Sequence, residues 1–593
     1  VKRVRAKSRL FMMDLASGEE TMLHDDLDQD MQETWAVHGL YPNMAWTPDS
    51  RHLVFWAHGK LWQLEPSAGR LQEIPFSIRD TRQVYPAPRS TVDVAPASFR
   101  TRMVRFAQRS PDGRAVVFES LGRLYIKRGT RRPEHLTGGE SGAFEYGPVW
   151  SPDSRHLYFL RWDDRELSTL HRVGVNGGAA TAIPLAKGQY TELAISAEGS
   201  TLALRKRAGH KLLHPEWGQQ PGIYTLDLDE GDLQFVSERG TEPHFGPDDR
   251  IYARERANAA SGRGSETARS KLISMTPEGH DVRELASVAN ASTIRLAPDG
   301  RHIAWIDGYH VYLSAATPGG GPVELDATKP AFPSMRVSEV GGTYLYWSAD
   351  GSSLSWSTGP ELHTVTAADA LAPGFAPPAH GVDLSMDVQH AAPDTRLALV
   401  NARIVTMNAE REVIERGTLL LEGNRIRELG AAADITVPAG FDTVDLAGST
   451  IIPGLVDIHA HGPYGQGQII PQQNWSLLAH LALGVTTVHD PSSSAHLVFA
   501  AAEYARAGKI LGPRIYSTGE IVYGAKSVRY SQVDSLDDAL SHVRRLKAQG
   551  AISVKNYNQP RREQRQQIIE AARMEGLMCV AEGGSLYHQD MNL

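Results

Sequence analysis

Two histidines one residue apart, His459 and His461, have the types and spacing best suited to chemistry in this sequence. A Pro-Gly pair and a short apolar run, 455–458, precede them and predict a β-strand. Side chains alternate along a strand, so both imidazoles would point to one face. Two imidazoles on one face can chelate one divalent metal ion. The spacing alone is weak evidence, because 23 histidines in 593 residues give about one such pair by chance.

Alternating strand and helix patterns follow this pair. The predicted strands cover 455–459, 485–489, 514–518, 552–556 and 577–581, with helices at about 475–483, 495–507, 536–549 and 561–575. Repeating βα units with short links predict a parallel sheet, and we expect a TIM barrel. In such a barrel the active site lies at the C-terminal ends of the strands.

Four further candidates follow these strand ends. Lys555 ends the fourth predicted strand. His489 ends the second, Glu520 and Tyr523 follow the third, and these three residues are candidates for substrate contact. Each also has a structural interpretation: a solvated or ion-paired lysine, a hydrogen-bonded histidine at the rim, and two polar loop residues.

The predicted barrel is short. A complete (β/α)₈ barrel takes about 250 residues, whereas 455–593 holds five predicted strands. We therefore expect the sequence to be cut at both ends, at Val1 and at Leu593. The missing strands would lie beyond Leu593, and the chain alone would be inactive.

A repeat fills the first two thirds of the chain. Each copy of the repeat has an aromatic or apolar residue, then Ser, Thr or Ala, and then Pro-Asp-Gly/Ser or a close variant. The copies begin at Trp46, Arg109, Trp150, Ile195, Phe245, Leu296 and Trp347. Pro-Asp-Gly between apolar runs predicts a β-turn, and periods near 40–50 residues predict propeller blades. The aspartates are then turn formers. The array is a scaffold or a gate over a neighbouring site, or else a docking surface for a peptide or protein partner.

Residues 367–395 are rich in Ala, Pro and Gly and predict a linker. Short β runs follow in 396–454, with a Glu-Gly-Asn turn between two of them.

The order of these motifs, ending in Pro453-Gly454-Leu455-Val456-Asp457-Ile458-His459-Ala460-His461, resembles the amidohydrolase superfamily. These metal-dependent hydrolases include dihydroorotases, imidazolonepropionases and Xaa-Pro dipeptidases. The repeat resembles the TolB-type β-propeller. Together the resemblances imply a multidomain chain: a propeller of at least seven blades (1–366), a linker (367–395), a small β-sandwich lobe (396–454) and the N-terminal part of a TIM barrel (455–593).

The amidohydrolase resemblance implies one or two divalent metal ions, in the first instance Zn²⁺, held by His459 and His461. It implies that Lys555 is carboxylated by CO₂ and bridges the metals. The family usually has a histidine after the fifth strand, and this sequence does not. The general base that the family uses would lie beyond Leu593. Glu582 is the nearest replacement ligand and His588 a weaker one.

The function implied is hydrolysis of a carbon–nitrogen bond in an amide, a cyclic amide or a dipeptide, so the substrate is a small molecule or short peptide. The alternative is a non-catalytic propeller binding module with a degenerate barrel. A prolyl-oligopeptidase-type peptidase needs a Gly-x-Ser-x-Gly elbow, which this sequence does not contain.

Composition excludes other classes. The net charge is −8 without a long basic run, so nucleic acid is not an expected partner. No apolar run approaches the roughly 18 residues of a membrane span. The single cysteine, Cys579, excludes internal disulfides. The resemblance implies a periplasmic or secreted protein, although the sequence shows no signal peptide.

Overall fold

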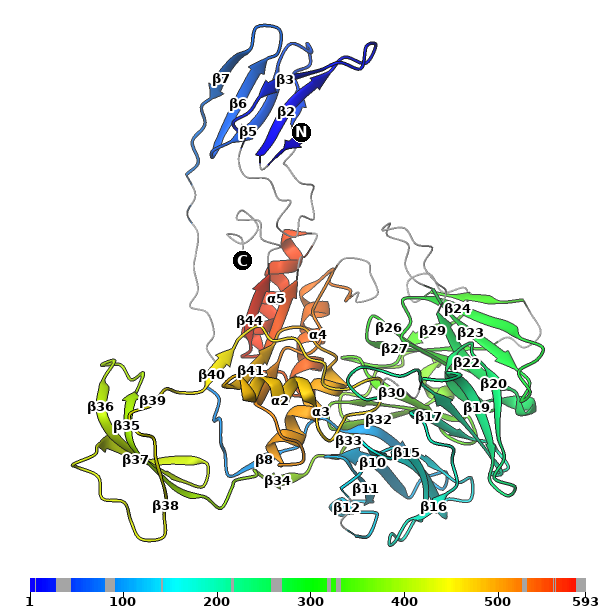
Figure 1. Ribbon diagram of the computed structural model, residues 1–593. Helices are drawn as coiled ribbons and strands as arrows, with labels where there is room; N and C mark the ends of the chain where they lie inside the picture. The colour runs from blue at the N-terminus through cyan, green and yellow to red at the C-terminus, as the bar shows by residue number, and fades with distance from the viewer. Residues whose placement is uncertain are drawn as a thin grey trace. The chain divides into compact units, whose positions relative to one another are not determined.

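The computed structural model describes the chain except residues 6, 28–43, 80, 82–90, 140–141, 215–217, 257–268, 317–320, 327–331, 525–530, 558, 560 and 583–593. The chain divides into two units, which are described separately. One comprises Val1–Pro88, Asn556–Gln566 and Ala581–Leu593, and the other comprises Arg89–Lys555 and Gln567–Val580. Strands dominate both (Figure 1). No helix among the described residues is long and apolar enough to cross a membrane.

The first unit contains two antiparallel sheets near the N-terminus. One sheet has strands β1 (Lys2–Val4), β2 (Lys7–Met13) and β3 (Glu20–His24), and the other has β4 (Ala45–Trp46), β5 (Leu53–Ala57), β6 (Lys60–Glu65) and β7 (Arg70–Ile74). Leu10 of β2 packs with Phe55 of β5 and Leu64 of β6 in one apolar cluster. The turn of the first sequence repeat joins β4 to β5.

Six sheets of four or five strands follow in the second unit. They are β9 (Arg105–Arg109), β10 (Ala115–Ser120), β11 (Arg123–Arg128), β12 (Glu134–His135); β13 (Phe144–Trp150), β14 (His156–Asp163), β15 (Leu167–Gly174), β16 (Thr181–Ile183); β17 (Tyr190–Ile195), β18 (Thr201–Lys206), β19 (Gly222–Asp227), β20 (Leu233–Ser237); β21 (Thr241–Phe245), β22 (Ile251–Arg256), β23 (Arg269–Met275), β24 (Arg283–Ala289), β28 (Val323–Leu325); β25 (Thr293–Leu296), β26 (His302–Asp307), β27 (His310–Ala315), β29 (Ser334–Arg336); and β30 (Thr343–Trp347), β31 (Ser353–Thr358), β32 (Glu361–Thr366), β33 (Val382–Asp383).

These six sheets close into a ring, which is a β-propeller. Each sheet packs against the next along the chain, and β30 and β31 of the last pack against β9 of the first. Six of the seven sequence repeats join the first two strands of these sheets. The predicted role of the aspartates is confirmed: Asp112 accepts hydrogen bonds from the Ser110 hydroxyl at 2.6 Å and from the Arg114 backbone at 3.1 Å.

The predicted extent of the propeller differs from this ring. We expected at least seven blades within 1–366, whereas the described ring closes with six. The remaining repeat, which is the first along the chain, lies in the sheet β4–β7, and this sheet belongs to the other unit. The repeat pattern detects blade-like sheets, but it carries no information on which sheets share a ring.

The segment predicted as a linker, 367–395, contributes strands to the propeller. After helix α1 (Ala367–Ala370), β33 completes the last sheet, and β34 (Asp387–Gln389) pairs antiparallel with β8 (Ser98–Arg100) ahead of the first sheet. We call the β8–β34 pair the clasp, because it ties the two ends of the ring. The segment is rich in Ala, Pro and Gly, and these strands are too short to show the alternation of apolar and polar residues that predicts a strand.

Residues 396–451 form one mixed sheet instead of the expected sandwich. Its strands are β35 (Arg396–Val405), β36 (Val413–Glu422), β37 (Arg425–Ala431), β38 (Asp442–Asp445) and β39 (Thr450–Ile451). The order is β37-β36-β35-β38, with β39 also on β35. Ala402, Ile404 and Leu419 form a small buried cluster, and Ala398 and Leu420 are buried as well. The apolar pattern predicted the strands but not how many layers they form.

The alternation of strands and helices predicted after residue 454 is confirmed. The elements are β40 (Leu455–Asp457), α2 (Trp475–Ala482), β41 (Val485–Asp490), α3 (Ala495–Arg506), β42 (Arg514–Ser517), α4 (Leu536–Gln549), β43 (Ser553–Tyr557), α5 (Arg562–Met574) and β44 (Met578–Glu582). Local signals explain the helix starts. Asn474 caps α2, and Ser535 and Asp538 form a capping box on α4. β40–β42 form a parallel sheet and β43 pairs with β44, so a closed TIM barrel stays a prediction.

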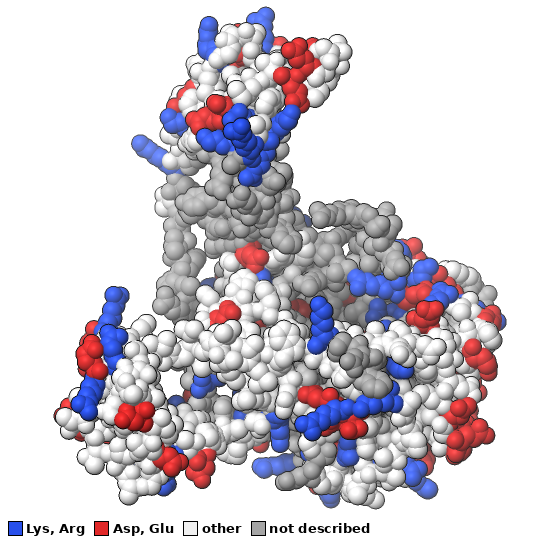
Figure 2. All heavy atoms as spheres, in the orientation of Figure 1, with Lys and Arg blue, Asp and Glu red and all other residues white. Residues whose placement is uncertain are grey.

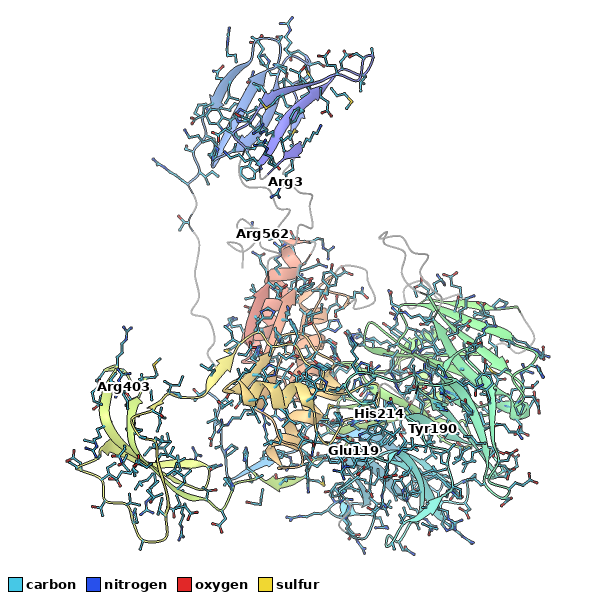
Figure 3. All side chains as sticks on the ribbon, viewed as in Figure 1. Arg3, Glu119, Tyr190, His214, Arg403 and Arg562 are labelled. Carbon is cyan, nitrogen blue, oxygen red and sulfur yellow. The ribbon has the colours of Figure 1, made fainter. Side chains whose placement is uncertain are left out.

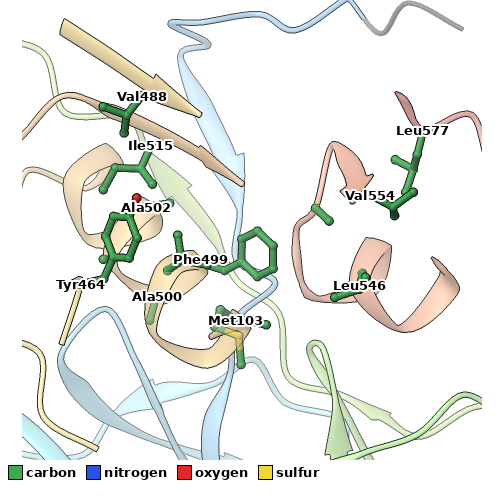
Figure 4. Packing of buried hydrophobic residues seen from close by; sticks show 14 of the residues in the cluster. Met103, Tyr464, Val488, Phe499, Ala500, Ala502, Ile515, Leu546, Val554 and Leu577 are labelled. Atoms are coloured by element: carbon green, nitrogen blue, oxygen red, sulfur yellow. The ribbon is translucent and has the colours of Figure 1, made fainter. Parts of the chain in front are cut away.

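One apolar core joins these βα units to the propeller. Phe499 of α3 and Leu546 of α4 pack with Ile515 and Val554, and Met103 enters the same cluster ahead of the first propeller sheet (Figure 4). Charges of both signs are interspersed on the face shown in Figure 2. The propeller and the βα units therefore form one packed body within the second unit.

Candidate functional site

The two histidines follow β40 but lie outside it. The strand ends at Asp457, and His459 stands in a turn in which its backbone N–H donates to Asp457 Oδ1 at 3.0 Å. The rings are nevertheless neighbours, with centroids 5.1 Å apart and planes at 70°. Both side chains are exposed, His461 by 52%. A turn thus brings together the pair that the sequence predicted on one strand face.

Asp490, at the end of β41, organises the loop that carries His461. Its carboxylate is fully buried, and Oδ1 lies 3.6 Å from His461 Nδ1. Oδ2 accepts from the Gly462 N–H at 3.0 Å, and Oδ1 from the Ser492 N–H at 2.8 Å. Burial, together with this carboxylate, raises the pKa of Tyr464 well above its usual range. The sequence analysis did not single out Asp490; an aspartate directly after His489 at a strand end was the available signal.

His489 lies on β41 as predicted, close to the histidine pair. Its Nε2 and the Ser553 hydroxyl of β43 are 2.8 Å apart. Burial lowers the pKa of His489, although a hydrogen bond to the Ile458 backbone and the charge of Asp490 oppose that shift. The imidazole is therefore neutral at neutral pH, and it joins the ends of β40 and β41 to β43.

Lys555 is buried within β43, with 3% of its surface exposed. Its carbonyl accepts the Val522 N–H at 3.0 Å, which ties β43 to the segment after β42. Tyr523, half-buried in that segment, accepts the Ser531 N–H at its carbonyl at 2.8 Å.

Glu520 has structural partners. Its Oε1 accepts from the Ala495 N–H at 2.8 Å and so caps α3, where the Ser494 side chain makes no capping bond. Its Oε2 accepts from Arg545 Nη1 at 3.0 Å. Both carboxylate oxygens of Glu520 therefore have partners within the protein. A role of Glu520 in substrate binding stays a prediction.

The remaining candidates lie elsewhere. Glu582 ends β44 in the first unit, and His588 is outside the described residues. Over the described part of the chain, no three or more His, Cys, Asp or Glu residues are grouped to hold a metal ion. The donor chemistry of His459 and His461 fits two ligands of a divalent metal; the other predicted ligands stay predictions.

Comparisons with known proteins connect a short stretch of the chain with named enzymes. No protein-family model matches. The chain is 40% identical over 65 residues to a 5-methylthioadenosine/S-adenosylhomocysteine deaminase of Bacillus thuringiensis (strain Al Hakam), which covers 10% of this chain and 14% of that one. It is 45% identical over 69 residues to an imidazolonepropionase of Bradyrhizobium diazoefficiens, or 11% and 17% of the two chains. The chain thus spans 14% to 17% of the length of these relatives.

Solved structures resemble the chain only distantly. A Xaa-Pro dipeptidase with bound methionine matches 32% of this chain and 56% of its own, with 18% identity and a TM-score of 0.27. TolB from Acinetobacter baumannii matches 58% and 81%, with 13% identity and a TM-score of 0.32. Both TM-scores are below 0.5.

Proposed function

We propose that this chain is an amidohydrolase-type enzyme that hydrolyses a carbon–nitrogen bond in an amide, a cyclic amide or a dipeptide. The observation that carries the proposal is the pair of imidazoles 5.1 Å apart, just past the C-terminal end of a parallel strand. Active sites of parallel βα folds lie at this end. The partial similarity to a deaminase and to an imidazolonepropionase supports the same class.

His459 and His461 would hold a divalent metal, for which we propose zinc. Such a metal would supply Lewis-acid chemistry for polarising the scissile carbonyl and activating a water at neutral pH. Asp490 beside His461 would keep that imidazole in the tautomer and orientation needed for binding, as carboxylate partners of metal-bound histidines do.

Lys555 and Glu582 complete the proposed ligand set. The amine of Lys555 would take up CO₂ and form an anionic carbamate, which is an oxygen ligand for the metal. Lys555 is buried on β43, which suits this role. Glu582, at the end of β44, would stand where the resembled family has a histidine. Whether one or two metals bind depends on both residues.

The substrate would be positioned by neighbours of the metal ligands. His489 is neutral and can donate or accept a hydrogen bond at the strand ends. Tyr523 lies in the segment that follows β42. Both carboxylate oxygens of Glu520 already accept hydrogen bonds, one from the first turn of α3 and one from Arg545, so a substrate would have to share one of them. The propeller, packed on α3 and α4, would act as a scaffold or gate.

The test compares two pairs of histidines in the natural protein that contains this sequence. Metal content is measured by elemental analysis, and hydrolysis is assayed on Xaa-Pro dipeptides, cyclic amides and an imidazolone. H459A/H461A should lose both the bound metal and the hydrolytic activity. H210A/H214A is the matched control, because its histidines lie in a propeller loop where their backbones form an isolated bridge. It should keep both.

Equal metal content in the wild type and in H459A/H461A would refute the metal assignment. A wild type without stoichiometric metal and without turnover would favour the alternative, a non-catalytic propeller binding module. The two results are distinguishable. In the first, metal is bound to the wild type and to H459A/H461A alike, whereas in the second the wild type binds no stoichiometric metal.

A further inference from the structure

A cavity of about 310 Å³ lies within the second unit, away from the histidine pair. The clasp and the segment before it form one wall, and α3, β42 and the turn between α4 and β43 form the other. Lining residues include Phe99, Phe499, Glu503, Arg506 and Arg514. Neither histidine of the proposed metal site lines it, so this cavity is a separate feature.

Glu503 of α3 is a lining residue of this cavity and has one carboxylate oxygen without a hydrogen-bond partner among the described residues. The residue is 5% exposed. Its Oε1 accepts the backbone N–H groups of Arg102 at 2.6 Å and Met103 at 3.1 Å. Its Oε2 is buried and has no hydrogen-bond partner among the described residues. A buried polar atom without a partner costs about 1–3 kcal/mol, which a hydrogen bond to a ligand would offset.

The cavity carries an excess of positive charge. Arg102, Arg506 and Arg514 line it, and within the described chain none of the three forms an ion pair with a carboxylate. Their side-chain hydrogen bonds and ring contact are to neutral groups. Arg514 donates to the Val94 carbonyl at 3.1 Å, Arg506 lies 5.9 Å from the Tyr516 ring centroid, and Arg102 donates to the Lys547 carbonyl at 3.5 Å.

The charged groups around Glu503 come from both walls. Arg506 lies on the same helix, the Arg102 and Met103 backbone donors come from the propeller side, and Glu119 of β10 faces it from the first sheet. Asp93, His390, Arg100 and Arg514 belong to the cavity lining, and Arg100 is paired with Asp383 at 2.7 Å. Burial raises the pKa of Glu503 to about 7, against the pull of the backbone donors and Arg506, and Glu119 adds to the rise.

We propose that this cavity binds a small organic oxyanion, held by Arg102, Arg506 and Arg514 and hydrogen-bonded by the carboxyl group of Glu503. Phe99 and Phe499 supply the apolar surface for the rest of the molecule. The charge excess selects an anion, and the aromatic lining selects an organic one. The proposal does not depend on the function proposed for the histidine pair.

Benzoate, neutral benzamide and acetate are suitable probes, measured by isothermal titration calorimetry on the intact protein. Benzoate should bind, whereas benzamide, without the charge, and acetate, without the ring, should each bind about tenfold or more weakly. R506Q should weaken benzoate by a similar factor. R114Q is the matched control, because the Arg114 side chain is 87% exposed in a propeller turn, and it should bind like the wild type.

The pH dependence tests Glu503 itself. Benzoate keeps its charge between about pH 6 and about pH 8, whereas Glu503 changes from donor to repelling carboxylate over this range. Wild-type affinity should therefore fall as pH rises. E503Q keeps an oxygen for the Arg102 and Met103 N–H groups and a permanent donor, so it should bind without this pH dependence. Equal binding of benzoate and benzamide, or an unchanged pH dependence in E503Q, would overturn the proposal.

Discussion

The Tyr504 hydroxyl of α3 donates a hydrogen bond of 2.6 Å to Glu119 Oε1 of β10, across the boundary between the βα units and the propeller. Glu119, labelled in Figure 3, is fully buried and also accepts the Gly122 N–H at 2.8 Å. Its other oxygen lies 3.3 Å from Arg105 Nη1. Arg105 in turn donates to the Gln468 carbonyl, in the loop that follows the histidine pair. A buried polar network therefore links the propeller to the loop beside the proposed metal site.

Tyr504→Phe should reduce the free energy of unfolding by about 1–3 kcal/mol, because it leaves one buried hydrogen-bonding position of Glu119 unfilled. Chemical denaturation of the variant and the wild type would measure the difference. Tyr516→Phe, a half-buried tyrosine of the neighbouring strand β42, is the matched control and should change stability little. Equal stability of Tyr504→Phe and the wild type would show that this contact does not form in solution.

Asp307, at the end of β26, should make the protein less stable as pH rises. Burial, with the nearby charge of Asp326 second, raises the pKa of Asp307 to about 7, whereas an unfolded chain holds an aspartate near about 4. Between these pH values the folded state keeps a proton that the unfolded state has released. The stabilisation is therefore complete below about pH 4 and is lost as pH rises through about 7.

Thermal unfolding of Asp307→Asn and the wild type across this pH range would test the assignment. The difference in melting temperature should favour the variant increasingly toward pH 7, because asparagine does not ionise. Asp229→Asn, in an exposed turn, should follow the wild-type curve. Parallel curves for Asp307→Asn and the wild type would contradict the raised pKa.

The strands and helices after residue 454 could be predicted because each one carries its own local pattern. The second predicted strand, 485–489, differs from β41 by one residue. The histidine pair was also visible in the sequence, but the turn at His459 was not, because it depends on the Asp457 carboxylate capturing a backbone N–H. The apolar run continues through Ile458 and predicts a strand there.

Contacts between distant segments could not be predicted in this way. Tyr504 and Glu119 are 385 residues apart, and no spacing in the sequence relates them. The clasp joins β8 to β34 through strands of three residues, which have no readable period. Such pairings arise from the packing of whole elements. Local patterns in a single sequence predict the elements but not which of them are in contact.

Glu520→Gln would separate a structural role of Glu520 from a substrate role. Arg545 is 2% exposed, pairs with Glu520 at 3.0 Å and lies 3.8 Å from the Tyr309 ring centroid. Neutralising Glu520 leaves a buried guanidinium without its counter-ion, which costs about 3–5 kcal/mol in a fully buried pair. Because Glu520 is 22% exposed, we expect a loss near the lower figure.

The readout is the free energy of unfolding without any substrate. The double variant E520Q/R545M should regain part of the loss, because the unpaired charge is gone. Wild-type stability of E520Q, combined with a raised KM, would instead assign Glu520 to substrate binding.

Asp490→Asn tests whether the buried carboxylate serves the proposed metal site or only its loop. The wild-type carboxylate accepts from Gly462 and Ser492 and lies 3.6 Å from His461. An asparagine turns a donating amide toward one of these neighbours and removes the charge that orients the imidazole. Loss of such a partner typically lowers metal affinity by about 10–100-fold. We therefore expect zinc affinity, measured by competition with a chelator, to fall by that factor while far-UV circular dichroism stays unchanged. Asp434→Asn, at an exposed site of the small mixed sheet, should leave the affinity as it is. If Asp490→Asn binds zinc as tightly as the wild type, Asp490 acts only in shaping the loop, and the orientation of His461 must have another source.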